Sequence, residues 1–467
     1  MQLKRKFSVR NQLTIATSAL LISTFTPDAN AALGADMQAT DTIKSPKNSK
    51  KLNTKIVNDS DSFAISSLYY AEEGRVKVNK MQTLISNQLD DNNLLKTNFI
   101  YDTMTGSSPN GRKYIPNTSG LVTVTTASGN SFNTEGSAAN PAAATWLTVF
   151  ADQRLAGSVE WDHSLTSILT TTLGSSVSSE NDYTSYSGTG KVLLELNQKR
   201  TAFTFGSSFT QDTIRPIGGI PQSLGVLTCS DDASARAFAP AWLNCDSTIN
   251  STTKSREKSI NDYFIGVTQV WNQHTIFQLN YSQGKENGYL TDPYKQASII
   301  DKEFNDEVEI AILHEKRPDT RNTQSVFFRL VNAPTDSLSI NMSYRYFWDD
   351  WEIESNTFDV RFRFNLNNHF YIQTHARYNT QTSAFFFSPY IDVTDKESDN
   401  FSAPKFFSAD HRLGDQTTTT GGIKLGRNLG DVGKVGLRIE QMRQRYTNNQ
   451  IPNMKAWIIQ MLLSFKF

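Results

Sequence analysis

The feature that most constrains the fold of this chain is a strict alternation of apolar and polar residues along most of its length. The segment FDVRFRFNL (358–366) shows it most clearly, and segments 339–348 and 370–378 repeat it. Successive side chains of a strand point to opposite faces, so each segment predicts a strand with one apolar and one polar face. Two architectures fit this pattern: a soluble β-sandwich with apolar faces in its core, or a membrane barrel with its apolar face in lipid.

The lengths of the connections favour the barrel. Short turns alternate along the chain with long polar loops. Barrels of bacterial outer membranes have tight turns at the periplasmic ends of their strands and longer loops outside. Sandwiches built from Greek-key connections have no reason to alternate so regularly. The long loops are expected near 103–148, 178–187, 213–258, 285–322 and 386–407.

The pattern therefore predicts an all-β, transmembrane, antiparallel up-and-down barrel of about sixteen strands, with fourteen or eighteen left open. The segment EVEIAILHEK (307–316) also has strand character. As a spanning strand it would make the number odd, whereas bacterial single-chain barrels have even strand numbers. It is therefore expected to form a hairpin inside the loop 285–322.

The N-terminal residues predict export. Four basic residues within the first ten precede the apolar run LTIATSALLISTF, and Ala29-Asn30-Ala31 offers a cleavage site. These features indicate a secretory signal peptide over 1–31, because the alternative, a membrane anchor, needs an apolar run of about 20 residues. Residues 32–60 are polar and aperiodic, which is typical of a flexible periplasmic leader. The barrel is expected over 61–467, in the outer membrane of a Gram-negative bacterium.

The C-terminal segment WIIQMLLSFKF (457–467) alternates so that one face is wholly apolar. With Trp457, Phe465 and Phe467 on that face, it resembles the insertion signal read by the outer-membrane assembly machinery. The last strand is also expected to close the barrel against the first, so that no edge is left open. Outer-membrane lipid and the assembly machinery are thus expected partners. Aromatic residues near the strand ends are expected to form two interfacial girdles, namely Trp161, Trp271, Phe370, Phe465 and Phe467 on the periplasmic side and Trp348, Trp351 and Tyr446 outside.

The polar faces of consecutive strands carry a ladder of charged residues expected to line the lumen. With LNN (366–368) as a turn, Asp359 is predicted to lie opposite His375, with Arg377 diagonal to both. The ladder either sets a preference for small polar or anionic solutes or pairs with carboxylates and stiffens the wall. The loop 213–258 is a candidate to fold inward as a constriction. The predicted lining residues are Arg329, Arg345, Asp359, Arg361, Arg363, His375 and Arg377.

Five short motifs are similar to those of a family of Gram-negative outer-membrane barrels labelled only as a domain of unknown function. They are TGSSPNG (105–111), SSENDYTS (178–185), GYLTDPYK (288–295), RPDTR (317–321) and YRYFWDDWEI (344–353). The resemblance supports the fold and the compartment, and it implies no established activity.

The predicted topology places these motifs at the extracellular mouth. Their polar side chains either knit the loops into a folded cap or form a ligand site, and the cap is the favoured interpretation. The residues expected at the mouth are Asp182, Tyr183, Asp292, Tyr294, Arg317, Asp319, Arg321, Asp349, Asp350 and Trp351.

Other chemistry finds little support in the sequence. Cys229 and Cys245 are expected to form a disulfide, since no metal-ligand spacing surrounds them and an exported chain permits one. No catalytic or phosphate-binding motif is present, so neither an enzyme nor a metal or other cofactor is expected. Net charge is zero, and nucleic acid is not an expected partner. The sequence thus predicts an outer-membrane pore or transporter for small polar solutes. The alternatives are a non-conducting barrel whose cap binds a partner or that sleeves a larger complex, and a secreted soluble β-protein.

Overall fold

The computed structural model describes most of the chain from residue 61 onward. The described residues are 61–113, 121–125, 131–135, 146–231, 233–236, 239–245, 253–302, 308–394, 402–430, 432–447 and 451–467. The expected signal peptide and leader lie outside the described residues.

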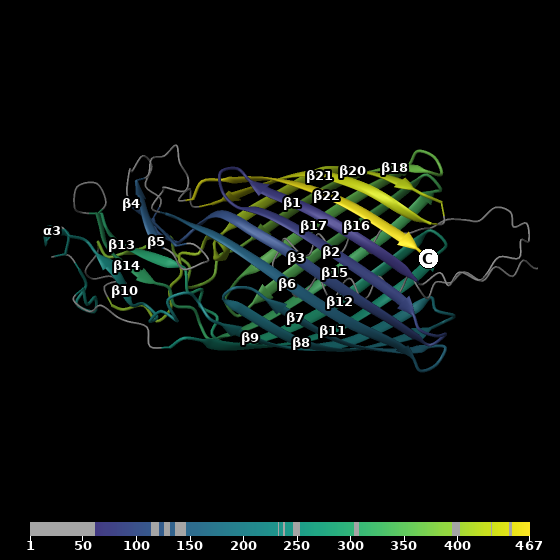
Figure 1. Cartoon of the computed structure of the whole chain (residues 1–467), viewed down its shortest axis with the longest axis horizontal. Coiled ribbons are helices and arrows are strands. Elements are labelled where there is room, and N and C mark those ends of the chain that lie inside the picture. Colours follow the sequence, from purple (N-terminus) through teal and green to yellow (C-terminus); the bar gives the residue numbers. More distant parts are fainter. Residues whose placement is uncertain are drawn as a thin grey trace, which may run out of the picture.

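Sixteen strands form one closed antiparallel barrel, which confirms the predicted fold and strand number (Figure 1). In hydrogen-bonded order they are β1 (Ser62–Glu72), β2 (Lys77–Gln88), β3 (Asn93–Pro109), β6 (Leu147–Ser164), β7 (Leu169–Ser179), β8 (Tyr183–Leu196), β9 (Thr201–Ile214), β11 (Arg256–Asn272), β12 (Thr275–Gly288), β15 (Thr320–Thr335), β16 (Leu338–Asp349), β17 (Glu354–Asn365), β18 (Phe370–Gln381), β20 (Gln416–Asn428), β21 (Gly433–Tyr446) and β22 (Met454–Lys466).

The first and last strands close the ring. β1 pairs with β22 along its whole length, with Ser62 opposite Lys466 and Glu72 opposite Ala456. The amide of Phe467 also donates to the carbonyl of Asp61. The alternating C-terminal segment thus forms β22, a strand that is paired along both edges, with β1 and with β21.

The outer face of the barrel is apolar and exposed. Leu155 is 64% exposed and Ile423 is 51% exposed, and large apolar side chains stand at outward positions on every barrel strand. An apolar belt of this extent is far larger than the patches that soluble monomers expose. The alternation therefore places the apolar face outside, as in a membrane barrel, and not in a core between two sheets.

The long loops fold into a cap at one end of the barrel, whereas the short turns and the C-terminus lie at the other end (Figure 1). We call these the cap end and the turn end. A four-stranded sheet forms the centre of the cap, in the order β10 (Val226–Cys229), β14 (Val308–His314), β13 (Gln296–Asp301) and β19 (Ile391–Asp392). As predicted, the described part of the segment 307–316 contributes a strand, β14, to a hairpin, β13–β14, that stays outside the barrel. A second sheet pairs β4 (Leu121–Thr125) with β5 (Ser131–Glu135).

The cap has a hydrophobic core of its own. Ala297, Ile299 and Leu313 from the β13–β14 hairpin are fully buried and pack with Ile391 and Leu243 from two other loops. Only two short helical turns occur among the described residues, α3 (Ala233–Arg236) and a 3-10 turn (His411–Leu413). No helix in the described part of the chain has the length and apolarity needed to span a bilayer.

Two expectations about the strand ends were wrong. The segment 178–187 forms no long loop, because β7 and β8 continue to a tight turn that the Glu180 amide closes on the Tyr183 carbonyl at 2.8 Å. Trp351 and Tyr446 join no outer girdle, because both are buried, at 3% and 6% exposure. Trp161 and Trp271, by contrast, are exposed near the turn end of their strands.

The lipid-facing assignment predicts the effect of a charge on the outer face. Replacing Ile423, in the middle of β20, by Arg should destabilise the barrel folded into lipid vesicles by about 2 to 4 kcal/mol. The folded fraction is measured by urea titration and gel mobility without heating. Ile423→Leu is the matched control and should change stability little. Equal stability of Ile423→Arg and the wild type would contradict a lipid-facing belt.

Candidate functional site: the inner wall and the cap

The predicted lining residues all occupy inward positions on β15 to β18. On β17, Phe358 and Phe362 are exposed outside, while Arg361 between them is buried inside. On β18 the same alternation turns His375 and Arg377 inward. Arg329 and Arg345 lie at inward positions of β15 and β16.

The predicted register between β17 and β18 was wrong by two residues. Asp359 lies opposite Arg377, and Arg361 lies opposite His375. The turn has three residues, as LNN would, but lies one residue later, because the Leu366 amide donates to the Phe370 carbonyl and the Asn367 side chain accepts from the amides of both His369 and Phe370, at 2.8 and 2.9 Å. His369 is therefore part of the turn, and the strand partners move accordingly.

His375 nevertheless contacts Asp359 along the diagonal. Its Nε2 lies 2.7 Å from Asp359 Oδ2, and its Nδ1 lies 2.7 Å from Glu440 Oε1. Both contacts are hydrogen bonds only when both ring nitrogens carry a proton. Glu440 stands two strands away on β21, and Gly422 on β20 makes room for it, since a Cβ there would overlap the Glu440 side chain.

The arginines of this wall also have amide and aromatic partners. Arg329 Nε donates to Asn341 Oδ1 at 3.1 Å, and Arg363 Nε donates to Asn365 Oδ1 at 3.2 Å. The Arg363 guanidinium also lies 3.8 Å from the centre of the Tyr371 ring, a cation–π contact. These contacts hold the guanidinium groups against the wall in fixed orientations.

The inner face of β15–β21, which we call the basic wall, carries far more cations than anions. Below the Arg321–Asp349 pair at the cap end, its inward carboxylates are Asp359 and Glu440, and both engage His375. Its inward cations are Arg329, Arg345, Arg361, Arg363, Arg377, Lys424, Lys434 and Arg438.

The inner face of β2–β12, which we call the acidic wall, has a small excess of inward carboxylates over inward cations. Its inward carboxylates are Asp102, Asp152, Glu160, Asp162, Glu195, Asp212, Asp262 and Glu286. Its inward cations are Lys80, Lys96, Arg154, Lys191, Arg256 and Lys258. Several pairs form within this wall, among them Lys96–Asp162 at 2.7 Å and Arg154–Asp102 at 2.6 Å.

A buried ionic cluster joins the cap to the barrel mouth, and Asp410 is its centre. Asp410 is fully buried and accepts from Arg317 Nη2 at 2.8 Å and from Arg412 Nε at 2.8 Å, with Lys295 Nζ 3.7 Å away. Burial alone would raise the pKa of Asp410, but Arg412, Lys295 and Arg317 hold it well below its ordinary value. Arg317 also pairs with Glu315 at 2.6 Å.

The remaining mouth residues connect the cap to neighbouring strand ends. Arg321 pairs with Asp349 at 2.5 Å and stacks on the Trp351 ring at 4.5 Å. Trp351 Nε1 donates to the Thr320 carbonyl at 2.9 Å. The other predicted mouth residues also have partners. Asp350 accepts from the Asn322 amide, Asp292 pairs with Arg412, and the backbone carbonyl of Asp319 accepts from the Gly288 amide. The hydroxyl of Tyr183 donates to Asp212, and that of Tyr294 donates to Asp182.

Three carboxylates meet at the rim beside Tyr294. Asp152, Glu180 and Asp182 place one oxygen each within 4.8 Å of the others. Burial raises the pKa of Glu180 to about 7 against the effect of Arg154, with Asp152 and Asp182 adding to the rise. This group of oxygens could accept a divalent cation, but Tyr294 and Asn181 already donate to Asp182 and Asp152.

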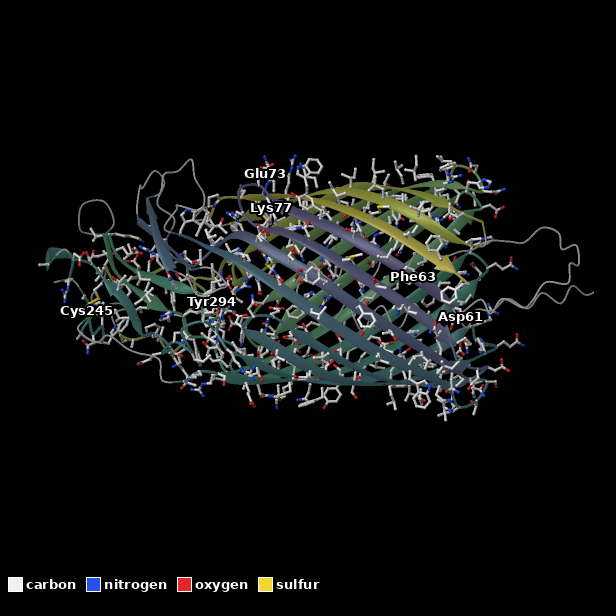
Figure 2. All side chains as sticks on the ribbon, in the orientation of Figure 1. Asp61, Phe63, Glu73, Lys77, Cys245 and Tyr294 are labelled. Carbon is white, nitrogen blue, oxygen red and sulfur yellow. A yellow bond between two sulfur atoms is a disulfide. The ribbon has the colours of Figure 1, made fainter. Side chains whose placement is uncertain are left out.

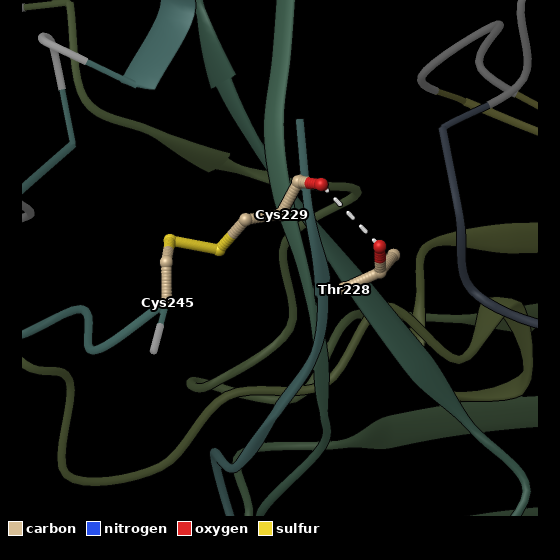
Figure 3. Close-up of a disulfide and its surroundings, with 3 residues drawn as sticks. All are labelled: Thr228, Cys229 and Cys245. Atoms are coloured by element: carbon tan, nitrogen blue, oxygen red, sulfur yellow. Dashed lines mark hydrogen bonds between the residues drawn. A yellow bond between two sulfur atoms is a disulfide. The ribbon is translucent and has the colours of Figure 1, made fainter. Parts of the chain in front are cut away.

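The loop 213–258 is not a constriction in its described part. Its strand β10 pairs with β14 in the cap sheet. Cys229 and Cys245 form a disulfide within it, with Cα atoms 5.8 Å apart (Figure 3). Cys245 lies in the cap on the far side of Tyr294 from the barrel (Figure 2). The loop is held outside because its apolar residues complete the core of the cap.

Sequence reasoning missed several residues of both sites. Asp410 and Arg412 lie in SADHRLG, a polar stretch with no spacing signal of its own. Glu315 and Lys295 border predicted mouth residues in sequence, so their neighbourhood was a usable signal. Glu440 is an inward position of a recognisable strand, yet its contact with His375 depends on how three strands pair.

Together these features define a closed sixteen-strand barrel of the outer-membrane type, with a charged inner wall and a folded cap. The chain belongs to the family described as "Protein of unknown function (DUF3570)", which matches residues 11–461. No sequence among the curated proteins matches this chain.

Solved structures of outer-membrane barrels are similar to it at low identity. The structure titled "Bacterial polysaccharide outer membrane secretin" matches with a TM-score of 0.43 and 9% identity, over 88% of this chain and 99% of that chain. The siderophore receptor PirA from Pseudomonas aeruginosa matches with a TM-score of 0.38 and 7% identity, over 88% of this chain and 62% of that chain. PirA from Acinetobacter baumannii matches with a TM-score of 0.38 and 10% identity, over 89% of this chain and 61% of that chain. A barrel of this kind suggests the outer membrane as its location, and no function is inferred from these similarities.

The ionic cluster predicts a large effect of one substitution on the cap. Asp410→Asn removes the carboxylate that faces Arg317, Arg412 and Lys295, and it should destabilise the cap by about 3 to 5 kcal/mol because buried cations lose their counter-charge. The readout is the rate at which thermolysin cleaves within the cap loops of the folded protein. Asp319→Asn, the same change at an exposed mouth position, should leave that rate near the wild type. Equal rates for the two variants would contradict the role of Asp410.

Acidification is expected to loosen the cap before the barrel. Burial, helped by Lys295, lowers the pKa of His411 from 6.5 to about 3. His411 thus binds fewer protons in the folded cap, so its contribution to stability is complete above pH 6.5 and is lost as the pH falls toward 3. The contribution of Asp410 is complete above its ordinary 3.8 and is lost below it. Glu315, whose pKa burial raises, acts in the opposite direction.

Hydrogen exchange of β13, corrected for intrinsic rates, measures this effect. Protection of β13 should fall between pH 6.5 and pH 4, while protection of the barrel strand β20 should stay constant. His411→Gln should reduce the fall. The prediction is wrong if both proteins show the same pH dependence in β13.

Proposed function

We propose that this protein passes small polar solutes across the outer membrane of a Gram-negative bacterium without altering them chemically. The observation that carries the proposal is the polar inner face of a closed barrel. All sixteen strands pair around a lumen whose wall bears charged and amide side chains, while the apolar residues of the same strands face outward. Barrels of about sixteen strands enclose aqueous channels in this membrane.

The cap makes a selective conduit a better fit than a general pore. A folded unit with its own core stands over the cap end of the barrel, and the cluster around Asp410 fixes it to the mouth. The lining charges below it are held by neighbours within the wall, as Arg363 is by Asn365 and Tyr371. An arrangement of fixed charges under a cap favours discrimination among small solutes over free passage.

Export and insertion complete the proposal. The signal peptide predicted over 1–31 would deliver the chain to the periplasm. The apolar face of β22, which includes Phe465 and is followed by Phe467, would present the signal to the outer-membrane assembly machinery. In the lipid bilayer, the turn end with both described termini would face the periplasm and the cap would face outside.

The cap itself favours a second candidate function, which is binding of a partner at the cell surface. Its sheet, hydrophobic core and disulfide form a small folded unit. Under this alternative the barrel anchors the cap, or serves as the membrane sleeve of a larger complex, and conducts nothing. Stable co-purification of a surface or periplasmic protein, with no conductance of the purified barrel, would favour it.

Conductance in planar bilayers tests the proposal and the role of the basic wall. The wild type should conduct and should prefer chloride over potassium. Arg361→Gln with Arg363→Gln should lower the anion-to-cation permeability ratio by about twofold or more, because two lining charges are removed. Reversal potentials in a KCl gradient measure the ratio.

Arg443→Gln with Arg445→Gln is the matched control, because both arginines lie at exposed, outward positions of β21. Its permeability ratio should equal that of the wild type. Absence of conductance from the correctly folded protein would overturn the proposed passage. Unchanged selectivity in the Arg361/Arg363 variant would make those arginines wall supports only.

A further inference from the structure

The two inner walls of opposite charge face one another across the lumen. In the ring of sixteen strands, β6 and β17 are eight strands apart and therefore stand on opposite sides. β6 belongs to the acidic wall and β17 to the basic wall. The charge separation thus runs across the barrel, perpendicular to the direction of passage.

One pair of residues shows the geometry at a single level. Glu160 lies four residues before the turn end of β6 at Ser164, and Arg361 lies four residues before the turn end of β17 at Asn365. Both occupy inward positions, as the exposed outward neighbours Val159, Trp161 and Phe362 confirm. A partly exposed carboxylate and a guanidinium of which only 7% is exposed therefore point inward from opposite walls, each four residues from the turn end of its strand.

Several contacts fix these groups in place. Arg361 Nε lies 3.4 Å from Asp359 Oδ1, and Asp359 is itself bound to His375. The side chain of Glu160 packs over Gly174 on the neighbouring strand, where a Cβ would come within 3.2 Å of its Cγ. Fixed charges that need not reorient act more strongly on a passing solute than mobile ones do.

We infer that the lumen selects small zwitterionic solutes, whose carboxylate would face the basic wall while their ammonium group faces the acidic wall. This inference rests on the proposed function and names its solute class. A neutral solute gains nothing from a transverse field, and an anion gains from one wall only. A zwitterion gains from both walls when it lies across the channel.

The experiment compares two isomers of equal size in liposomes that contain the folded protein. β-Alanine is a zwitterion and lactamide is its neutral isomer, and swelling rates measure the entry of each. The wild type should admit β-alanine faster than lactamide. Glu160→Gln and Arg361→Gln should each reduce that ratio by about twofold, as expected for one charge removed at the lumen wall.

Glu73→Gln is the matched control, because it makes the same change at a side chain in the β1–β2 turn at the cap end, labelled in Figure 2, that is largely exposed. Its ratio of β-alanine swelling rate to lactamide swelling rate should equal that of the wild type. Gel mobility without heating establishes that each variant is folded before its rates are compared.

Ion selectivity separates a transverse field from a simple anion preference. Both lumen variants should lower the preference for β-alanine, yet Glu160→Gln should raise the anion-to-cation permeability ratio while Arg361→Gln lowers it. The inference would be overturned, with the proposed passage left intact, if both isomers entered at equal rates. It would be overturned likewise if Glu160→Gln left the ratio of β-alanine entry to lactamide entry unchanged. Entry of neither isomer above protein-free liposomes would overturn both.

Discussion

The pairing of β1 with β22 is the constraint on which the rest of the structure depends. A bilayer core offers no water to backbone amides and carbonyls, so a sheet crosses it only when no edge is left open. The eleven residues from Ser62 to Glu72 meet the last strand residue by residue and close the ring. Once the ring is closed, each strand has one face in lipid and one toward the lumen, and the two-residue alternation assigns every side chain to one of them.

Closure turns many charged side chains toward the inside of the barrel, where each is stabilised by a partner of opposite charge or a hydrogen bond. His375 is the partner of the two carboxylates of the basic wall, since Asp359 and Glu440 both contact its ring. On the other wall, Lys96 and Arg154 pair with aspartates on adjacent strands. Local contacts of this kind satisfy individual groups without equalising the two sides, and the imbalance between the walls gives the lumen its transverse polarity.

The cap follows the rules of a soluble protein. Its core is built of buried apolar residues, its sheet is short, and a disulfide closes one of its loops. The ionic cluster at its base is costly to bury and is balanced only because three cations surround Asp410. Such a cluster is sensitive to the loss of a single member, because the remaining buried charges then lack a partner.

The sequence by itself determined the barrel, a strand number of about sixteen and which residues face inward, because alternation and loop length are local properties of a strand and its turns. It also placed the motif residues Arg321 and Asp349 at the mouth. Only the tertiary structure decided that Trp351 is buried, that Asp410 is the centre of a cluster, and that Asp359 lies opposite Arg377. These outcomes depend on a turn that lies one residue later than expected and on loops that meet across large sequence distances, and no pattern within a single segment records such contacts.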